Sequence, residues 1–521
     1  MGGEWTAAGE KLFTALNPAT CESLLPSFHE ATDAEVDRAL QLADQAVDAL
    51  QTLPRETMAS FLEEIAIGLE TAREVLIARA HAETALPVQR LEAECARTVG
   101  HCRSFAQMVR ASAWSQPRID HGNPHRQPVA KPELRTLLVG VGPVVVFGAS
   151  NFPLAISVAG TDTISAFAAR CPVVVKAHPA HPGTCELVAQ IIAQSAAKWH
   201  LPAGVFSLLQ GADNSLGTAL VVHPQTSAVA FTGSLRGGRA LFDLAVSRPR
   251  PIPFYGEMGS ANPVFVLPGA AKQQAEAIAR GYVQSINMGV GQYCTNPGLL
   301  FVTSGADGDR FIAATTECVS QVLPATMLHS VIHSSYVTGL NRIAQTPGIK
   351  VVAQSPADGI VDSLQAACTL FTASVDVLDE HPELTEEVFG PESIVFCCQS
   401  VDQMIGIARK MDCHLTATIH GTEQDLLEHA ELVRILQRKV GRLVFNGFPT
   451  GLEPCHALHH GGPYPAATHS YFTSVGQQAI YRFTRPICFQ GVPDAALPDE
   501  IQERNPLGID RLVDGKLIPG R

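Results

Sequence analysis

Residues 137–150 read "LLVGVGPVVVFGAS", an apolar run that ends in small residues. The same form returns in "AARCPVVVKAHP" (168–179), "GVFSLLQG" (204–211) and "TSAVAFTGS" (226–234). Short continuous apolar runs bounded by Gly, Pro and Ser are typical of strands that are buried on both faces. A helical pattern, residues 183–198, lies between the second and third runs. Strands that alternate with helices predict an α/β fold with a parallel, helix-covered sheet.

The sequence on either side of this block has a different texture. Residues 33–115 have helical spacing of apolar residues, and Thr32 precedes them as a plausible helix cap. Residues 116–136 carry four prolines, which predicts an extended or looping segment. A second α/β block begins near residue 259, with strands in "NPVFVLPGA", "GLLFVTSG", "SIVFCC", "LTATIHG" and "GRLVFNGF". The tail, residues 460–521, is rich in Gly, Pro and aromatics and suggests an extended or packing arm.

Composition excludes several classes of function. The chain has 521 residues, 46% of them hydrophobic, which is enough for a large core and more than one domain. Its formal net charge of −13 comes without the basic stripe that nucleic acids require. No apolar run is long enough to span a bilayer. Thirteen scattered cysteines, an odd number, favour a reduced, cytoplasmic compartment.

A single thiol lies in the glycine-rich stretch "GVGQYCTNPG" (289–298). Glycines allow another molecule to come close to the backbone, and a core cysteine has no need of them. We therefore interpret Cys294 as a nucleophile, which acts as the thiolate and needs a stabilising environment. The alternative is that Cys294 is a small buried hydrophobe, as the other cysteines are expected to be.

Two further polar residues have the chemistry that such a thiol needs. Glu257, in "PFYGEMGSANP" (253–263), follows an apolar run and is a candidate general base whose pKa its apolar neighbours would raise. Asn151, in "FGASNFPLAI" (147–156), has an amide that can donate to a developing oxyanion. Taken alone, they are also consistent with a strand-end acid and a turn residue.

Ligands of parallel sheets bind beyond the carboxyl ends of the strands. Asn151, Lys176 and Gly233–Ser234 each come just after a predicted strand. The turn "FTGSLRGG" (231–238) can place backbone N–H groups near a pyrophosphate, although it lacks the spacing of the usual dinucleotide fingerprint.

Six motifs occur in order along the chain: "SNFPLAI", "VVVKAHP", "FTGS", "GEMGS", "GQYCTNPG" and "EEVFGP". In this order they resemble the aldehyde dehydrogenase superfamily over roughly residues 15–480. The stretches "KAHPAHPGT" and "GEMGSANPVFVLP" are most similar to the branch of 2-oxoglutarate semialdehyde (2,5-dioxopentanoate) dehydrogenases.

The resemblance implies NAD(P)-dependent oxidation of 2-oxoglutarate semialdehyde to 2-oxoglutarate through a thiohemiacetal and a thioester. Cys294 would attack the aldehyde, Asn151 and the Cys294 N–H would hold the oxyanion, and Glu257 would activate the hydrolytic water. The cofactor residues that it implies are Lys176, His178, Gly233, Ser234, Met258, Glu387 and Phe389.

The resemblance also implies the organisation of the chain. Residues 1–115 and 137–258 would form a Rossmann-like, parallel-sheet cofactor domain, and residues 259–455 a second α/β catalytic domain. Residues 116–136 and 460–490 would form a small β oligomerisation arm, so that the chain would be a homodimer or homotetramer. No nucleic-acid or membrane partner is expected.

The cofactor preference, the partner of the substrate carboxylate and the role of the histidines are each inferred from a few individual residues. Pro179 stands where NAD-preferring relatives often have a glutamate, so a 2′-phosphate is not repelled and NADP is favoured over NAD. Arg103, in the helical region, is a candidate partner for a substrate carboxylate. The histidines of "PCHALHHGG", His456, His459 and His460, match no zinc spacing and are interpreted as incidental loop residues, without a metal.

Four alternatives remain open at this point. One is a dehydrogenase of fatty or other aliphatic aldehydes, and another is a CoA-acylating dehydrogenase, against which the retention of Glu257 argues. A cysteine-dependent esterase or hydrolase would also use Cys294 and Glu257 but would need no dinucleotide site. A catalytically silent scaffold would not need the three polar residues together.

Overall fold

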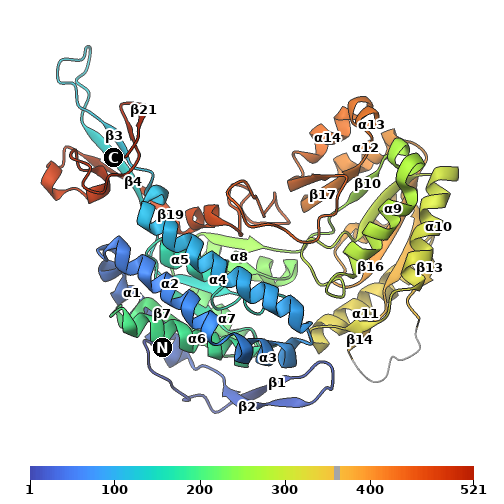
Figure 1. Ribbon diagram of the computed structural model, residues 1–521, viewed down its shortest axis with the longest axis horizontal. Helices are drawn as coiled ribbons and strands as arrows, with labels where there is room; N and C mark the ends of the chain where they lie inside the picture. The colour runs from blue at the N-terminus through green and yellow to red at the C-terminus, as the bar shows by residue number, and fades with distance from the viewer. Residues whose placement is uncertain (357–363, 521) are drawn as a thin grey trace.

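The computed structural model describes residues 1–356 and 364–520. Two α/β halves lie side by side, and a β arm that carries the C-terminus projects from one of them (Figure 1). In these residues no helix combines the length and the apolar character that a membrane crossing requires.

A five-stranded parallel sheet forms the first half, in the order β7-β6-β5-β8-β9. The strands predicted within 168–179, 204–211 and 226–234 are confirmed, and the sheet has the expected Rossmann-like α/β form. Its strands are β5 (Val144–Phe147), β6 (Val173–Lys176), β7 (Phe206–Leu209), β8 (Ala228–Thr232) and β9 (Phe254–Glu257).

Helices cover both faces of this sheet. The predicted helical region 33–115 contains four of them, and Thr32 caps the first through a capping box with Glu35. These four are α1 (Asp33–Gln51), α2 (Arg55–Thr71), α3 (Arg73–Thr84) and α4 (Val88–Ala111). The others are α5 (Thr161–Ala168), α6 (Pro182–Lys198), α7 (Ser215–Val222) and α8 (Leu235–Ser247).

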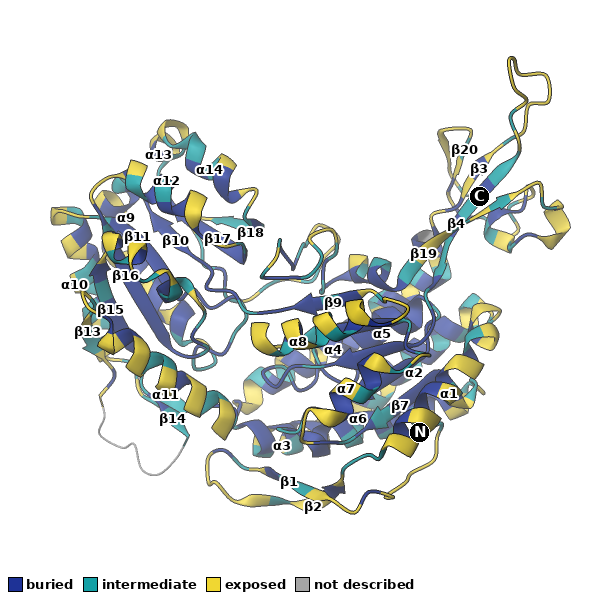
Figure 2. Cartoon of the chain, turned by 180° about the vertical axis from the view of Figure 1, so that it is seen from behind, coloured by how far each residue is buried: buried dark blue, intermediate teal, exposed yellow. Residues whose placement is uncertain are grey.

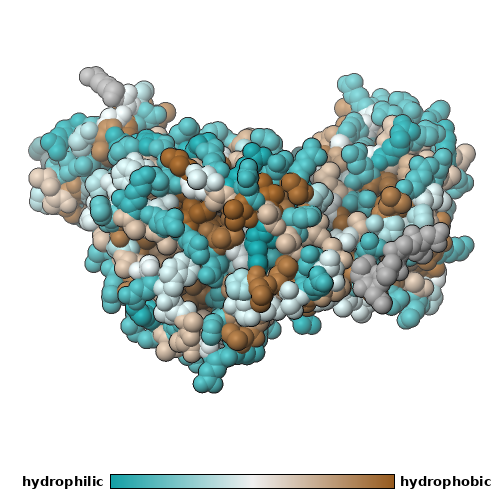
Figure 3. All heavy atoms as spheres, turned by 60° about the horizontal axis from the view of Figure 1, so that its bottom comes forward, coloured by the Kyte–Doolittle hydropathy of each residue, from teal (hydrophilic) through white to brown (hydrophobic). Residues whose placement is uncertain are grey.

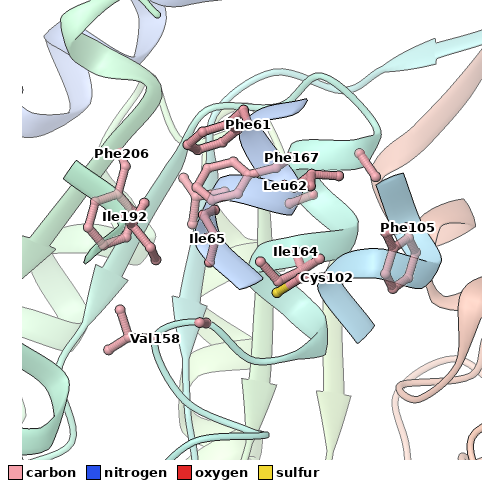
Figure 4. Close-up of a cluster of buried hydrophobic side chains, with 14 of the residues drawn as sticks. Phe61, Leu62, Ile65, Cys102, Phe105, Val158, Ile164, Phe167, Ile192 and Phe206 are labelled. Atoms are coloured by element: carbon pink, nitrogen blue, oxygen red, sulfur yellow. The ribbon is translucent and has the colours of Figure 1, made fainter. Parts of the chain in front are cut away.

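The valines of the sheet alternate between two cores. Val144 and Val146 pack with residues of α2, α4, α5 and α6, whereas Val145 packs on the opposite face with residues of α1 and α7. Figure 4 shows the first core, where Phe61 and Phe167 meet edge to face with ring centroids 5.2 Å apart. Burial of each such side chain contributes about 1.5–3 kcal/mol, which explains why the strands read as continuous apolar runs.

The opening stretch 137–150 is two strands, although its apolar pattern predicts one. β4 (Leu134–Gly140) ends before the turn at Val141–Pro143, and β5 begins after it in a different sheet. Gly142 has a φ of 112°, a backbone conformation that L side chains rarely adopt. Pro143 cannot donate a ladder hydrogen bond, so the pair ends one strand and redirects the chain.

The second half contains a seven-stranded sheet in the order β13-β15-β16-β11-β10-β17-β18, parallel except for the β13–β15 pair. Phe265, Phe301 and Phe396 stack across three adjacent strands, with centroids 5.0 and 5.4 Å apart. The strands are β10 (Val264–Val266), β11 (Leu299–Thr303), β13 (Lys350–Gln354), β15 (Thr369–Ser374), β16 (Glu392–Cys398), β17 (His414–His420) and β18 (Val440–Phe445). The helices are α9 (Pro268–Asn287), α10 (Ala306–Ser320), α11 (Ser330–Gln345), α12 (Val401–Lys410), α13 (Glu423–Glu428) and α14 (Ala430–Leu436).

The arm is a five-stranded sheet in the order β19-β4-β3-β20-β21. β3 (Arg118–Asp120) comes from the proline-rich stretch, and β19 (Thr484–Gln490) from the tail. The last strands, β20 (Arg511–Val513) and β21 (Lys516–Ile518), carry the sheet beyond the predicted limit at residue 490. Two small pairs complete the strands: β1 (Leu12–Leu16) with β2 (Ser23–His29), and β12 (Ala325–Thr326) with β14 (Gln365–Ala366).

Burial follows this layering. The inner strands of both large sheets are buried, whereas the edge strands β13 and β18 are largely half-buried or exposed (Figure 2). The face that comes forward in Figure 3 carries apolar patches within a hydrophilic surface. Such scattered exposure is normal for a folded chain. The predicted domain boundaries, 1–115 with 137–258 and 259–455, stay a prediction.

Candidate active site

Polar residues gather at the carboxyl edge of the parallel sheet. Asn151 lies in the loop after β5, Gly233 and Ser234 follow β8, and Glu257 ends β9. The Ser234 hydroxyl caps α8 by accepting from the Gly237 N–H at 3.2 Å. The free N–H groups of α8, a 13-residue helix, therefore begin at this edge.

A cavity of about 510 Å³ opens there. It brings together most residues that the sequence predicts for the site: Asn151, His178, Gly233, Ser234, Glu257, Met258, Cys294, Glu387 and Phe389 all line it. Burial raises the pKa of Glu387 to about 7. Lys176 is not on this wall, because its ammonium donates to the Gly211 carbonyl at 2.7 Å. Burial lowers the pKa of Lys176 to about 8.

A glycine allows the loop that carries Cys294 to pack closely against the neighbouring turn. Gly291 has a φ of 66°, and a Cβ there would lie 2.1 Å from the Gly390 carbonyl carbon. Only a residue without a side chain allows the loop to approach the "FGP" turn so closely. Asn262 then fixes the loop by donating to the Cys294 and Asn296 carbonyls, each at 2.9 Å.

Asn151 is tied to the same loop. Its Nδ2 donates to the Gln292 carbonyl at 2.9 Å, and the side chain is buried. An amide nitrogen carries two hydrogens, so one remains for another acceptor near Cys294. Glu94 on α4 holds the Asn151 loop from behind, since its Oε1 accepts from the Leu154 and Ala155 N–H groups at 2.8 and 3.0 Å.

Cys294, His460 and Glu257 form a compact cluster. His460 Nε2 lies 2.8 Å from Glu257 Oε1 and 3.4 Å from Cys294 Sγ. Ser474 Oγ donates to Glu257 Oε2. His460 and Glu257 are buried, whereas Cys294 is half-buried at the cavity wall.

The charges of this cluster show that the pKa shift expected for Glu257 from the sequence has the wrong direction. Burial does raise the pKa of Glu257, but the charge and hydrogen bond of His460 and the hydrogen bonds from Ser474 and Cys294 outweigh it. The pKa of Glu257 is therefore lowered, not raised, and the carboxylate is ionised. Burial and the neighbouring Glu257 charge place the pKa of Cys294 well above its ordinary value, so the resting group is a thiol.

A second cavity, of about 190 Å³, meets the first at Cys294 and Ile156. Its walls combine aromatic and basic groups. It is lined by Arg90, Ala93, Glu94, Arg97, Phe152, Ile156, Tyr293, Cys294, Thr295, Gly451, Leu452, His460 and Val475. The thiol thus stands at the junction between a large cavity and a small one.

The two arginines of the small cavity differ. Arg90 is held by several protein groups: it donates to the Tyr293 hydroxyl at 3.1 Å and the Asn151 carbonyl at 2.6 Å, and stacks 4.8 Å from the Phe152 ring centroid. Its Nη1 makes no hydrogen bond but lies 3.6 Å from Glu94 Oε2. The guanidinium of Arg97 has no hydrogen bond or ion pair within residues 1–356 and 364–520, and its Nε is buried. Burial lowers the pKa of Arg97, and the charge of Glu94 partly opposes that shift.

Arg103 does not reach this cavity. Its two terminal nitrogens donate to both Glu70 carboxylate oxygens, at 3.0 and 2.6 Å, on the exposed surface. Arg97, on the same helix, does line the cavity. Arg90, Glu94 and Arg97 stand at i, i+4 and i+7 and so share one helix face, a signal that the sequence did contain.

His460 corrects the interpretation of "PCHALHHGG" as an incidental loop. The segment after it runs beside β9, where Met258 N–H donates to the Ala466 carbonyl at 2.8 Å and Glu257 bridges to Ala467. This contact, between residues about 200 positions apart, brings His460 to the thiol. No spacing in the sequence distinguishes His460 from His459.

Comparison with known proteins identifies the family to which this chain is similar. The model of the aldehyde dehydrogenase family matches residues 5–477. The chain is 45% identical over 517 residues to alpha-ketoglutaric semialdehyde dehydrogenase 2 of Azospirillum brasilense, covering 99% of this chain and 98% of that protein. It is 43% identical over 518 residues to alpha-ketoglutaric semialdehyde dehydrogenase of Acinetobacter baylyi, with the same coverage.

Solved structures share the fold at low sequence identity. Aldehyde dehydrogenase C of Pseudomonas syringae, a mutant in complex with NAD+ and octanal, matches with a TM-score of 0.81 and 20% identity, over 95% of this chain and 97% of that one. The 1-pyrroline-5-carboxylate dehydrogenase of Thermus with bound NAD matches with a TM-score of 0.78 and 22% identity, over 94% and 92%.

Proposed function

The chain belongs to the aldehyde dehydrogenase family and is an NAD(P)-dependent aldehyde oxidoreductase, and on this premise we propose that it oxidises 2-oxoglutarate semialdehyde to 2-oxoglutarate. The two relatives above at 43–45% identity carry the name of this activity, alpha-ketoglutaric being the older form of 2-oxoglutaric. The proposal also rests on one feature of the small cavity.

That feature is the guanidinium of Arg97 beside Cys294, which has no hydrogen-bond or ion-pair partner in the part of the chain that the structure describes. An arginine without an anionic partner in a half-buried pocket is a receptor for a carboxylate, which it can bind through two parallel hydrogen bonds. A semialdehyde acid carries an aldehyde at one end and a carboxylate at the other. With the carboxylate on Arg97, its aldehyde carbon is directed toward the thiol. Phe152 and Tyr293 offer apolar ring surface to the carbons between.

This pocket argues against a fatty aldehyde as the preferred substrate. Its volume is about 190 Å³, and two arginines contribute to its walls. A long alkyl chain would need a larger cavity and would leave Arg97 buried without an anion, which is costly.

Glu257 is proposed to act twice as a proton acceptor. The Cys294 sulfur lies within 4.8 Å of a Glu257 carboxylate oxygen, and the carboxylate takes the thiol proton as sulfur attacks the aldehyde carbon. Glu257 releases this proton to solvent before the second step. After the acyl group is formed, the carboxylate accepts a proton from the water that hydrolyses the thioester. His460 and Ser474 donate to the same carboxylate and hold its orientation through both steps.

Asn151 is proposed to hold the oxyanion that forms at each attack. Its Nδ2 hydrogen not used by Gln292, together with the Cys294 backbone N–H, would donate to the developing charge. One such donor is worth about 2.7–4 kcal/mol of transition-state stabilisation.

The large cavity fits a nicotinamide dinucleotide. It lies beyond the carboxyl ends of the strands, and the start of α8 with Arg236 forms part of its wall, as expected for a pyrophosphate site. The residues proposed to hold the cofactor are His178, Gly233, Ser234, Met258, Glu387 and Phe389, with Lys176 beyond the wall. When bound, the nicotinamide supplies the hydride acceptor for the oxidation.

We also propose a preference for NADP over NAD. It is supported by Pro179, which offers no carboxylate to repel a 2′-phosphate. Lys198 does not contribute, because it pairs with Glu64 at 2.6 Å. The ratio of kcat/KM for the two cofactors measures this preference.

We also propose that the chain forms a homodimer or homotetramer in the cytoplasm. β18 ends the seven-stranded sheet and β19 ends the arm sheet, so each leaves a strand edge to which another copy can pair. Buried thiols such as Cys102 and Cys171 suit a reduced compartment.

The experiment that tests the function follows the absorbance of the reduced nicotinamide. Purified enzyme with NADP or NAD should reduce the cofactor with 2-oxoglutarate semialdehyde, at a kcat/KM well above that with a fatty aldehyde. Cofactor-independent ester hydrolysis without any such reduction would instead support the hydrolase. A higher kcat/KM with octanal would overturn the proposed substrate.

A further inference from the structure

We propose that Cys294, His460 and Glu257 form a reversible Zn²⁺ site that inhibits the enzyme. One ligand atom of each residue lies within 4.8 Å of the other two. Thiolate, imidazole and carboxylate are the three side chains that zinc sites use, and three protein ligands leave a fourth position for water or substrate.

The spacing of the ligand atoms is close to that around a tetrahedral ion. With ordinary zinc bond lengths, nitrogen and sulfur ligands stand about 3.6 Å apart, and nitrogen and oxygen ligands about 3.4 Å. Here His460 Nε2 lies 3.4 Å from Cys294 Sγ and 2.8 Å from Glu257 Oε1. Entry of an ion therefore requires the His460–Glu257 hydrogen bond to open by about half an ångström. The third pair, Cys294 Sγ and a Glu257 oxygen, lies within 4.8 Å and has to adjust to the ion as well.

The charge and support of the cluster also suit a dication. The carboxylate of Glu257 is ionised, and the thiol proton of Cys294 is released to solvent when sulfur binds, so two anionic ligands neutralise the ion. Arg97 places a positive charge nearby and limits the affinity. Ser474 donates to the second oxygen of Glu257 and fixes its orientation, which is the outer support that zinc ligands usually have.

An ion can reach the cluster because Cys294 lines both cavities. Once bound, it would occupy the sulfur lone pair that attacks the aldehyde and the carboxylate oxygen that accepts protons. Metal binding itself does not depend on the identity of the substrate, whereas the inhibition does depend on Cys294 being the nucleophile.

Binding of cobalt to such a site can be measured by absorption spectroscopy, without enzyme turnover. We expect Co²⁺ added to chelator-treated wild-type enzyme to give near-ultraviolet thiolate charge-transfer absorption that saturates at one ion per chain. Cys294→Ser should abolish this band and His460→Asn should weaken the binding at least tenfold. His459→Asn and Cys455→Ser are matched controls from the same loop and should keep the band. Circular dichroism establishes that each variant is folded.

Inhibition is then measured with Zn²⁺ and a neutral aldehyde, which does not chelate the ion. We expect loss of NAD(P)H formation that a chelator restores, and protection of Cys294 from iodoacetamide while zinc is bound. Equal cobalt absorption in wild type and Cys294→Ser, or zinc inhibition that leaves Cys294 fully open to alkylation, would overturn the site. A lack of cofactor reduction with every aldehyde, in the absence of zinc, would count against the proposed function alone.

Discussion

Replacement of Arg97 by Gln should remove the selectivity for a carboxylated aldehyde. Arg97 lines the small cavity beside Cys294 and has no protein anion as a partner in the described residues. A hydrogen-bonded interaction with a charged group contributes about 1.5–3 kcal/mol. The bidentate geometry and partial burial favour the upper part of that range, so kcat/KM should fall about 30- to 150-fold with 2-oxoglutarate semialdehyde.

The assay compares two substrates and two variants. Pentanal has the same number of carbons but no carboxylate, and its kcat/KM should change less than about threefold in Arg97→Gln. Arg103→Gln is the matched control, because Arg103 lies on the same helix but pairs with Glu70 at the surface. An exposed pair of this kind contributes about 0–1 kcal/mol, so both substrates should be turned over normally. Equal losses on both substrates in Arg97→Gln would refute the assignment, as would a selective loss in Arg103→Gln.

Three further substitutions test the catalytic side of the site. Asn151→Ala should lower kcat about 10²- to 10³-fold while cofactor binding, measured by fluorescence titration, stays unchanged. Glu257→Gln removes the carboxylate charge that raises the pKa of Cys294, so the pH curve for alkylation of Cys294 should shift to lower pH; an unchanged curve or an upward shift would contradict this account of the thiol. Arg90→Gln should lower kcat with carboxylated and neutral aldehydes alike, because Arg90 fixes Tyr293 and the Asn151 carbonyl; a loss confined to the carboxylated substrate would make Arg90 a carboxylate receptor.

The sequence predicts the sheet well because burial leaves a local trace. A strand covered on both faces, such as β6, must be apolar at every position, and its end is marked by Lys176. The apolar pattern does not show the break between β4 and β5, because both strands are apolar and only residues 141–143 separate them. The chain passes from one sheet to another here because of the backbone geometry of this turn. A pattern of hydrophobic residues does not show that geometry.

The motif residues of the site were found because each lies at a strand end or in a glycine-rich loop. Cys294, Glu257 and Asn151 all carry such local signals and line one cavity. His460 carries none, since its place depends on the contact of residues 466–467 with β9. Arg97 had a local signal, its shared helix face with Arg90 and Glu94, but only tertiary packing determines that this face meets Cys294.

The charge of Glu257 shows a further limit of sequence reasoning. Its apolar neighbours are visible in the sequence and predict a raised pKa. The groups that lower it, His460 and Ser474, are more than 200 positions away. The direction of a pKa shift depends on such partners as much as on burial.

The central claim is that Cys294 forms the acyl bond at the junction of the two cavities. Intact-mass and peptide mass spectrometry of Glu257→Gln, mixed with NADP and 2-oxoglutarate semialdehyde, test it most directly. At a pH at which the Cys294 thiol ionises without a base, the account predicts one equivalent of reduced cofactor per active site and a 2-oxoglutaryl group on the peptide that contains Cys294. An acyl group on another residue, or reduced cofactor formed while Cys294 stays unmodified and open to alkylation, would contradict it.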